Sequence, residues 1–470
     1  MAISLIAKPQ TFSPAYNQLK FIYDSTNNSE EGFRYVFDVY ESGTSNKIGE
    51  YRPLPRYSDG YGEIDLSKLL QAKLTLTYSN STTQDVVAPN NFYKYDVKVG
   101  EEYVVTYSWT ANLVDNGGNV KITPTAAHPF VVGDRVSVDG GVDNPNITGL
   151  FTVIAINGTT DFTISALWSE VDDATGNGSV VYADNRKTVT RDIITSTNNY
   201  VFNGAVRFLD WNDYDEAVYL VTTTGTDKFL TNQPTDFYIT PNQDVWFALC
   251  TNGVTTGRIY FENDGGDIMY YAANASAYIT LNNVGSNADP STVVSGTSGH
   301  IKTDTEYYDV WWADNTGTQG TQKYRFYIDR RCAINDYEIQ FLDRMGSISS
   351  FAFQLRAYKN GTINRQTYNK DLTGIVSSSE WTYLDTAQGL TTFQVNAETN
   401  LELSTNWMSE EMAQYFEELV TSPYTILFDG SVYRAVVVQD TGYQVESQRN
   451  KKLIKKTINV KYANQDTING

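Results

Sequence analysis

Helical patterns are confined to two short segments of this 470-residue chain, and their scarcity limits what the chain can fold into. The first covers residues 65–74, where Asp65 is placed as an N-cap and leucines share one face. The second covers residues 409–420, with Ser409 as the N-cap and Pro423 just beyond its end. The remaining sequence has to form strands and turns. We therefore predict a mainly β protein with few short helices.

Alternation of apolar and polar residues supports this fold class. Residues 351–358 have period two, which predicts one half-buried strand. Residues 432–438 and 453–462 show the same pattern less regularly, and Asp429-Gly430 before the first of them is a hairpin signal. We expect several domains built from mostly antiparallel sheets or sandwiches.

Turn-forming runs suggest how the chain is divided. Residues 106–185 contain about five short alternating segments separated by Gly-Asp, Gly-Gly and Asn-Gly pairs, which predicts an inserted small β-barrel. Residues 281–299 are rich in Gly, Ser, Thr and Asn and are expected to form a flexible loop. The predicted order is an N-terminal β domain at 1–105, the inserted barrel at 106–185, a continuation of the β domain at 186–280, the loop, and a C-terminal β domain at 300–470.

The chain is poor in residues that perform chemistry. It has two histidines, His128 and His300, and two cysteines, Cys250 and Cys332, against 34 Tyr, 21 Phe and 8 Trp. Acid/base, nucleophilic and zinc chemistry depend heavily on His and Cys, and no phosphate-loop, nucleophile-elbow or zinc-protease motif occurs. We expect a protein that is not an enzyme and has no metal or cofactor. The cysteines are expected to be buried thiols.

Charge and hydropathy exclude further classes of function. A net charge of −20 repels phosphate backbones, so we expect no sequence-independent nucleic-acid binding. No apolar run approaches the ~20 residues that cross a bilayer, so we expect no membrane partner. The first ten residues contain one Lys and a very short apolar stretch, and we do not expect a cleaved leader.

A basic strip near the C-terminus departs from the acidic character of the chain. It is interpreted either as a solvated edge strand that lysines protect from aggregation or as a contact for the acidic surface of a neighbouring subunit. The residues of the basic strip are Arg449, Lys451, Lys452, Lys455, Lys456 and Lys461.

An acidic cluster has a similar pair of interpretations. Asp210, Asp213, Asp215 and Glu216 lie within seven positions, and hard cations such as Ca²⁺ prefer several carboxylate oxygens. The spacing is not that of an EF-hand loop. An acidic turn at a subunit contact, opposite the basic strip, is the favoured interpretation.

Carboxylates beside two tryptophans raise the question of a sugar site. Asp304, Glu306 and Asp309 precede Trp311 and Trp312, and sugars stack on aromatic rings. Glycoside hydrolysis needs two carboxyls at a defined separation, which spacing in sequence does not set. Passive glycan contact through Trp311 and Trp312 is the alternative retained here.

Four stretches resemble virion proteins of tailed phages of Bacteroidota, including crAss-like phages. Together they sample most of the chain outside the predicted insertion. The first is PQTFSPAYN, FIYDS, FRYVFDVY and GEIDLS between residues 9 and 67. The second is FNGA, DW and KFLTN between residues 202 and 232. The third is FLDRMG at 341–346 with FAF at 351–353, and the fourth is residues 407–423 with the strands after them.

The predicted insertion has a resemblance of its own. HPFVVGDRVSV at 128–138, followed by NITGLFTV at 146–153, is similar to a small β-barrel module of phage tail and structural proteins. This resemblance implies that His128 is a turn residue before a barrel strand and not a ligand.

The resemblance implies a structural component of a bacteriophage virion in the tail, neck or baseplate region, assembled in the cytoplasm of the host bacterium. Such a protein is expected to form a homo-oligomeric six- or twelve-fold ring or collar, or an adaptor, by contacts with itself and with other tail or neck proteins. The alternative is a receptor- or glycan-binding tail-tip protein. Contact would use Tyr-, Trp- and Arg-rich patches, with charge complementarity setting the register.

Overall fold

A computed structural model describes residues 3–76, 84–104, 106–140, 144–171, 177–183, 188–251, 256–273, 279–331, 333–372, 375–377, 380–383, 386–440, 442, 454–464 and 466–469. The fold is mainly β, as the sequence predicts, and most strand pairs are antiparallel. Within the described residues, no helix is long and apolar enough to cross a membrane.

The chain forms two compact units, and both are discontinuous in sequence. Unit 1 contains Met1–Pro9, Leu19–Leu66 and Lys94–Asn199. Unit 2 contains Gln10–Gln18, Ser67–Tyr93 and Tyr200–Gly470. The sequence-based boundaries differ from this division because strands distant in sequence pair with each other: β7 lies in the predicted N-terminal domain but pairs with β21 of unit 2.

Unit 1 contains two open sheets. Alternate residues of their strands are buried aromatic side chains, so that Phe21 contacts Tyr95 and Tyr23 contacts Phe37 edge to face. The three-stranded sheet has the order β1-β3-β6, and the second sheet contains β15-β8-β4-β5. The bounds are β1 Ile3–Ala7, β3 Lys20–Ser25, β4 Arg34–Glu41, β5 Lys47–Tyr51, β6 Gly62–Asp65, β8 Phe92–Tyr103 and β15 Thr188–Phe202.

Between β8 and β15, six strands form a closed barrel in the order β10-β13-β12-β11-β14-β9, one strand more than the about five expected. Its interior is filled by apolar side chains such as Ile122, Val136 and Phe162. His128 lies before β11, accepts a hydrogen bond from the Phe130 backbone at 3.2 Å, and stacks on the Phe130 ring. The bounds are β9 Thr106–Asn116, β10 Asn119–Pro124, β11 Arg135–Asp139, β12 Gly149–Ile156, β13 Phe162–Leu167 and β14 Asn177–Ala183.

Unit 2 is built on a twelve-stranded sheet. Its main path is β27-β30-β33-β32-β31-β25-β26-β18-β21-β7, with β16 paired to β18 and β34 paired to β30. The bounds are β7 Asp85–Val87, β16 Leu220–Val221, β18 Trp246–Thr251, β21 Thr280–Asn283, β25 Tyr337–Leu342, β26 Ile348–Phe353, β27 Ala357–Asn369, β30 Leu390–Ser404, β31 Thr425–Phe428, β32 Tyr433–Val438, β33 Thr457–Tyr462 and β34 Asp466–Asn469. Strand β2 (Phe12–Pro14) pairs in parallel with the last three residues of β15.

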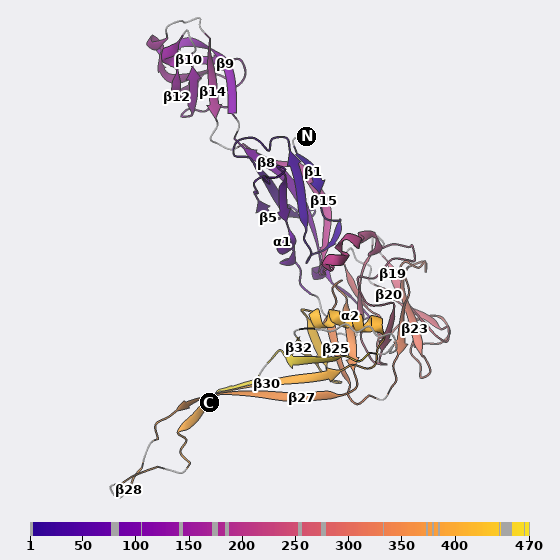
Figure 1. Cartoon of the computed structure of the whole chain (residues 1–470). Coiled ribbons are helices and arrows are strands. Elements are labelled where there is room, and N and C mark those ends of the chain that lie inside the picture. The colour runs from indigo at the N-terminus through magenta and orange to yellow at the C-terminus, as the bar shows by residue number, and fades with distance from the viewer. Residues whose placement is uncertain are drawn as a thin grey trace. The chain divides into compact units, whose positions relative to one another are not determined.

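A six-stranded sheet packs against this large sheet, and α2 (Glu410–Thr421) joins the same core (Figure 1). Its order is β17-β24-β23-β19-β20-β22. The Phe351 ring of β26 contacts Phe237 of β17 and Phe416 of α2 at centroid distances of 5.5 and 5.3 Å. The bounds are β17 Asp236–Ile239, β19 Gly257–Asn263, β20 Ile268–Ala273, β22 Thr292–Ser295, β23 Tyr307–Asp314 and β24 Tyr324–Ile328, with a separate pair β28 Ile375–Ser377 and β29 Glu380–Thr382.

The second predicted helix is confirmed as α2. Ser409 is its N-cap: the Ser409 hydroxyl accepts a hydrogen bond from the Met412 backbone N–H at 3.3 Å. Met412, Phe416 and Leu419 are buried on one face, and the helix ends before Pro423. The apolar stripe covers the sheet, as the sequence predicts.

Replacing Ser409 by alanine removes this cap and is expected to lower the free energy of unfolding by about 1 kcal/mol. Hydrogen exchange should be faster at the first-turn amides of α2, above all at Met412. Ser409→Asn is the matched control, because it keeps a side-chain oxygen that can accept the same bond. Equal exchange rates in the alanine variant and the wild type would show that the cap does not stabilise α2.

The first predicted helix is wrong in its bounds. Helix α1 contains only Ser67–Gln71 and begins two residues after Asp65. Asp65 instead ends β6, where it pairs with Lys20, and its carboxylate accepts a hydrogen bond from the Leu19 N–H at 3.0 Å. Strand pairing therefore keeps the backbone extended where local pattern favoured a helix.

Two of the three predicted strands near the C-terminus are confirmed and one is wrong. The hairpin of β31 and β32 turns at Gly430, whose φ is +88°, while residues 453–462 give the shorter β33. Residues 351–358 are split, because Phe353 is the last residue of β26 to pair with β25, and Ala357 is the first of β27 to pair with β30.

The flexible loop predicted at residues 281–299 is partly wrong, because this segment contains most of β21 and all of β22. Its polar side chains hydrogen-bond inside the fold: the Ser286 hydroxyl donates to the Thr240 carbonyl at 2.5 Å, and the Asn283 side chain accepts from the Gly285 N–H at 3.1 Å. A loop-like composition therefore supplies hydrogen-bond partners for buried backbone.

Candidate functional site

The outer face of the six-stranded sheet is lined by aromatic and charged side chains. Alternation along β23 sends Val310 and Trp312 into the core and leaves Tyr307, Asp309 and Trp311 on the other face. The neighbouring strands alternate in register with β23. We call this surface the aromatic face, and its residues are Tyr238, Arg258, Tyr260, Tyr270, Tyr307, Trp311, Lys323, Arg325 and Tyr327.

The rings of the aromatic face contact one another across strands. Tyr260 lies between Tyr270 and Trp311, with centroid distances of 5.2 and 5.3 Å, and the Tyr260 and Trp311 planes differ by 10°. Tyr327 in turn stacks on Tyr238 at 5.0 Å. Stacked rings have few ways to rearrange, so this face is held rigid before any partner binds.

Cations cover the faces of these rings. Lys323 Nζ lies 4.3 Å from the Trp311 centroid, the Arg258 guanidinium lies 4.5 Å from Tyr270, and the Arg325 guanidinium lies 4.1 Å from Tyr307. Such contacts are each worth about 0.5–1 kcal/mol at exposed sites. Arg, Tyr and Trp side chains arranged in this way are the types that dominate protein-binding surfaces.

The proposed sugar contacts are placed differently from the sequence-based expectation. Trp312 is fully buried in the core and has no ring face for a ligand, while Trp311 is 8% exposed beneath Lys323. Asp309 accepts two hydrogen bonds from Arg325, at 2.7 and 2.9 Å, so this carboxylate is part of an ion pair. Adjacent tryptophans in a strand cannot both face outward, because successive side chains alternate.

The acidic cluster lies in the 3₁₀ turns of residues 208–218. Asp210, Asp213 and Asp215 are exposed, and the Asp215 carboxylate accepts a hydrogen bond from the Ala217 N–H at 3.0 Å. Among the described residues, no group of three or more His, Cys, Asp or Glu side chains is placed to hold a metal ion. A subunit contact through this cluster remains a prediction.

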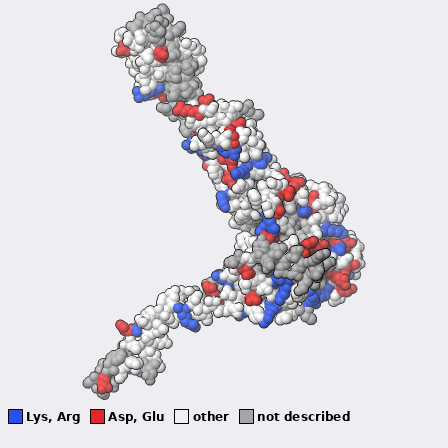
Figure 2. Space-filling model, in the orientation of Figure 1, with Lys and Arg blue, Asp and Glu red and all other residues white. Residues whose placement is uncertain are grey.

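The structure describes three of the six residues of the basic strip: Lys455, Lys456 and Lys461. Arg449, Lys451 and Lys452 lie outside the described residues, whereas Lys455 is exposed beside β33. The edge-strand interpretation is wrong for residues 457–462, because β33 pairs with β30 on one side and β32 on the other. Figure 2 shows basic and acidic side chains interspersed among uncharged ones on the visible face of unit 2.

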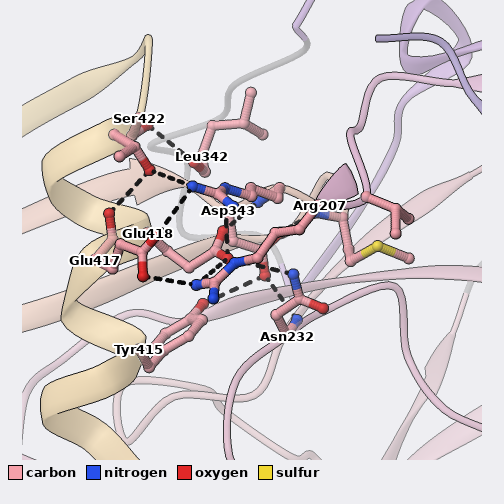
Figure 3. A network of polar contacts seen from close by, with 12 residues as sticks. Arg207, Asn232, Leu342, Asp343, Tyr415, Glu417, Glu418 and Ser422 are labelled. Atoms are coloured by element: carbon pink, nitrogen blue, oxygen red, sulfur yellow. Dashed lines mark hydrogen bonds and ion pairs between the residues drawn. The ribbon is translucent and has the colours of Figure 1, made fainter. Parts of the chain in front are cut away.

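A buried polar network joins the turn between β25 and β26 to the last turns of α2 (Figure 3). Asp343 is 2% exposed, and its two oxygens accept hydrogen bonds from the Thr231 hydroxyl at 2.6 Å and the Ser347 N–H at 2.9 Å. Arg344 donates its backbone N–H to Glu418 at 2.8 Å. Arg207 forms an ion pair with Glu417 at 2.9 Å. These bonds hold the last turns of α2 against the turn between β25 and β26.

Two carboxyls of unit 2, Asp343 and Glu338, have pKa values raised above their usual range. Burial, with a smaller effect of Glu418, raises the pKa of Asp343 to about 7. Burial, with a smaller effect of Asp244, raises the pKa of Glu338 to about 8. Glu338 lies on β25, on the sheet face opposite to Ile339 and the α2 core. No Lys or Arg pairs with Glu338 among the described residues, so a proton neutralises this carboxyl at pH 7.

Stability is therefore expected to depend on pH in a definite direction. A carboxyl with a raised folded pKa stabilises the fold fully below its unfolded pKa, and this contribution is lost as pH rises through the folded pKa. Unfolding temperature should fall between about pH 5 and pH 9 for the wild type. In Glu338→Gln the neutral amide should make this fall in unfolding temperature smaller, because a pKa raised from 4.5 to about 8 corresponds to a loss of up to about 5 kcal/mol of unfolding free energy over this pH range. Calorimetry across this pH range measures how the unfolding temperature of each protein depends on pH. The same dependence in the wild type and in Glu338→Gln would contradict the raised pKa of Glu338.

Sequence analysis missed the aromatic face and the buried network. Period-two alternation in residues 307–314 was the available signal for the first, since Tyr307, Asp309 and Trp311 occur at every second position. The network left no signal, because Arg207, Asp343 and Glu418 come from distant segments.

Comparisons with known proteins give no relative that establishes a family. No family model matches the chain, and no curated protein matches it. Among solved structures, the chain is similar to "Phage phi92 endosialidase", with 10% identity, coverage of 98% of this chain and 68% of that chain, and a TM-score of 0.17. It is also similar to dimeric latent PorU from Porphyromonas gingivalis, with 8% identity, coverage of 69% and 34%, and a TM-score of 0.13. Neither TM-score reaches the level at which two chains share a fold.

Proposed function

We propose that this chain is a structural component of a tailed-phage virion that acts by protein–protein contact through the aromatic face. The four stretches that resemble virion proteins of Bacteroidota phages suggest the class of protein. The single observation that supports a contact role is the set of aromatic rings on one sheet face, in the two groups Tyr270-Tyr260-Trp311 and Tyr238-Tyr327. Arg258, Lys323 and Arg325 lie over rings of this face. Rigid aromatic and arginine side chains give contact area at low entropic cost.

In this proposal the chain assembles into a homo-oligomeric ring or collar in the tail, with six- or twelve-fold symmetry, or serves as an adaptor to neighbouring tail proteins. Exposed Asp210, Asp213 and Asp215 of one copy contact the basic strip of another, and opposite charges set the register of the contact. Cryo-electron microscopy of purified particles tests the assembly. A six- or twelve-fold ring on the tail axis is expected, and peripheral trimers or absence of the chain from particles would contradict it.

Reversing two charges of the aromatic face is expected to prevent incorporation into particles. In the double variant Arg258→Glu and Lys323→Glu, both cation–ring contacts are lost and like charges oppose the former partner surface. The amount of this chain that co-sediments with particles should fall at least about tenfold, equivalent to about 1.4 kcal/mol.

The matched control is the double variant Lys359→Glu and Lys370→Glu, which changes net charge equally at exposed positions near the two ends of β27. This control should enter particles like the wild type. Equal loss in both variants would attribute the effect to net charge, and wild-type incorporation of the first variant would refute the role of the aromatic face.

A further inference from the structure

Unit 2 has a cavity of about 430 Å³ that shares no residue with the aromatic face. Its floor comes from β25 and β26, one side from β31 and β32, and its rim from the segment before β18 and from Asn287. Four separate parts of the chain therefore converge on one hollow. We call it the amide–carboxyl cavity.

The floor of the amide–carboxyl cavity contains a buried carboxyl. Glu338 is 6% exposed, pairs in register with Ala352 and Phe428, and accepts a hydrogen bond from Gln340 at 3.2 Å. The neutral, protonated form of this group has an O–H that can donate to a ligand oxygen. A neutral carboxyl in a cavity lined by polar groups is a common feature of ligand sites.

A second carboxyl beside the floor is held in a fixed orientation. Asp244 accepts a hydrogen bond from Asn283 at 2.9 Å and another from the Tyr433 hydroxyl at 3.3 Å. These bonds from two separate segments fix the carboxylate before a ligand arrives. An oriented acceptor next to an O–H donor suits a ligand hydroxyl, which both donates and accepts.

Aromatic rings form one wall. Phe428 and Tyr433 lie with ring centroids 4.8 Å apart, and both rings are half-buried. Tyr337 adds a third ring to the lining. A pyranose ring has an apolar C–H face that packs on such rings, while its hydroxyls reach polar groups at the edge.

The rim offers amides that the fold does not use. Asn242 and Asn287 are exposed, and their side chains form no hydrogen bond with other described residues. Each side-chain amide presents two donors and one acceptor oxygen. Groups of this kind, free and adjacent to an aromatic wall, match a ligand rich in hydroxyls.

Charge restricts the ligand further. None of the described residues that line the cavity is Lys, Arg or His, whereas Asp244, Asp336 and Glu338 are carboxyls. Acidic sugars would be repelled or left without a counter-ion. A neutral, hydroxyl-rich ligand needs no counter-ion in this lining.

We propose that the amide–carboxyl cavity binds the end of a neutral oligosaccharide, with Asn242 and Asn287 on the hydroxyls and Phe428 and Tyr433 against the sugar ring. This function is additional to the protein–protein contacts of the aromatic face, and either can fail without the other. It gives a virion component a direct recognition of neutral surface glycans.

The test uses the full chain with a panel of neutral hexose and N-acetylhexosamine oligosaccharides, together with sialylated and uronate-containing ones. Saturation-transfer NMR and titration calorimetry report binding. At least one neutral oligosaccharide should bind, and the double variant Asn242→Ala and Asn287→Ala should weaken its binding at least about tenfold. Unfolding temperature should remain that of the wild type, because neither side chain forms a hydrogen bond with the other residues that the structure describes.

The matched control, Asn360→Ala with Asn364→Ala, removes two exposed amides from β27 and should bind like the wild type. The proposal is overturned by absence of binding to all neutral oligosaccharides, by binding of acidic ones alone, or by unchanged affinity of the Asn242 and Asn287 variant.

Discussion

Replacing Phe351 by alanine is expected to destabilise unit 2 by about 3–5 kcal/mol. Phe351 is 3% exposed, and its ring contacts Phe237 of β17, Phe341 of β25 and both Tyr415 and Phe416 of α2. The substitution leaves a cavity where two sheets and a helix meet. Since three elements border this cavity, none can close it without breaking contacts with the other two.

Calorimetry of the full chain measures this effect as a fall in the unfolding temperature of unit 2 by roughly 6–15 °C. The control is Phe393→Ala on β30, where the ring is 42% exposed and the expected cost is below about 1 kcal/mol. A similar small cost for Phe351→Ala would show that the two sheets and α2 do not share one cooperative core.

Replacing Asp343 by alanine should have an effect of comparable size for a different reason. The carboxylate accepts hydrogen bonds from the Met345 and Ser347 N–H groups and from the hydroxyls of Thr231 and Tyr415. Alanine leaves these donors buried without an acceptor, and each unsatisfied buried group costs about 1–3 kcal/mol. Partial hydration offsets some of the loss, so we expect about 3–4 kcal/mol in total.

Urea unfolding and hydrogen exchange of α2 measure this loss. Asp236→Ala is the control, because Asp236 is exposed on β17 and its carboxylate forms no hydrogen bond with the other described residues. Both variants delete an aspartate side chain, and they differ only in whether that side chain is buried and hydrogen-bonded. Equal urea midpoints for both would mean that the network of Asp343 does not hold α2 to the sheet.

Elements that depend on near neighbours in the chain were predictable. The cap of α2 at Ser409, its apolar stripe and the turn at Gly430 follow from interactions that span a few residues. The fold class follows from alternation in the same local way. Prediction failed at Asp65 and at residues 351–358, where pairing with distant strands decided where each element begins and ends.

The candidate sites also depend on contacts between distant parts of the chain, which the sequence pattern does not give. Sequence placed Trp311 and Trp312 together, but only sheet pairing determines which of two successive side chains faces the core. The basic strip was visible in the sequence, while its nearness to an internal strand was not.

The sequence by itself determined that this chain is a β protein, that Ser409 caps the helix α2, and that histidine and cysteine are few while aromatic residues are abundant. Only the tertiary structure decided that Tyr260 and Trp311 stack across strands, that Asp343 joins the turn between β25 and β26 to α2, and that Asn242 and Phe428 border one cavity. The physical reason is that capping and alternation are local, whereas surfaces and cavities depend on which distant strands pair and on the side from which each contributes its side chains.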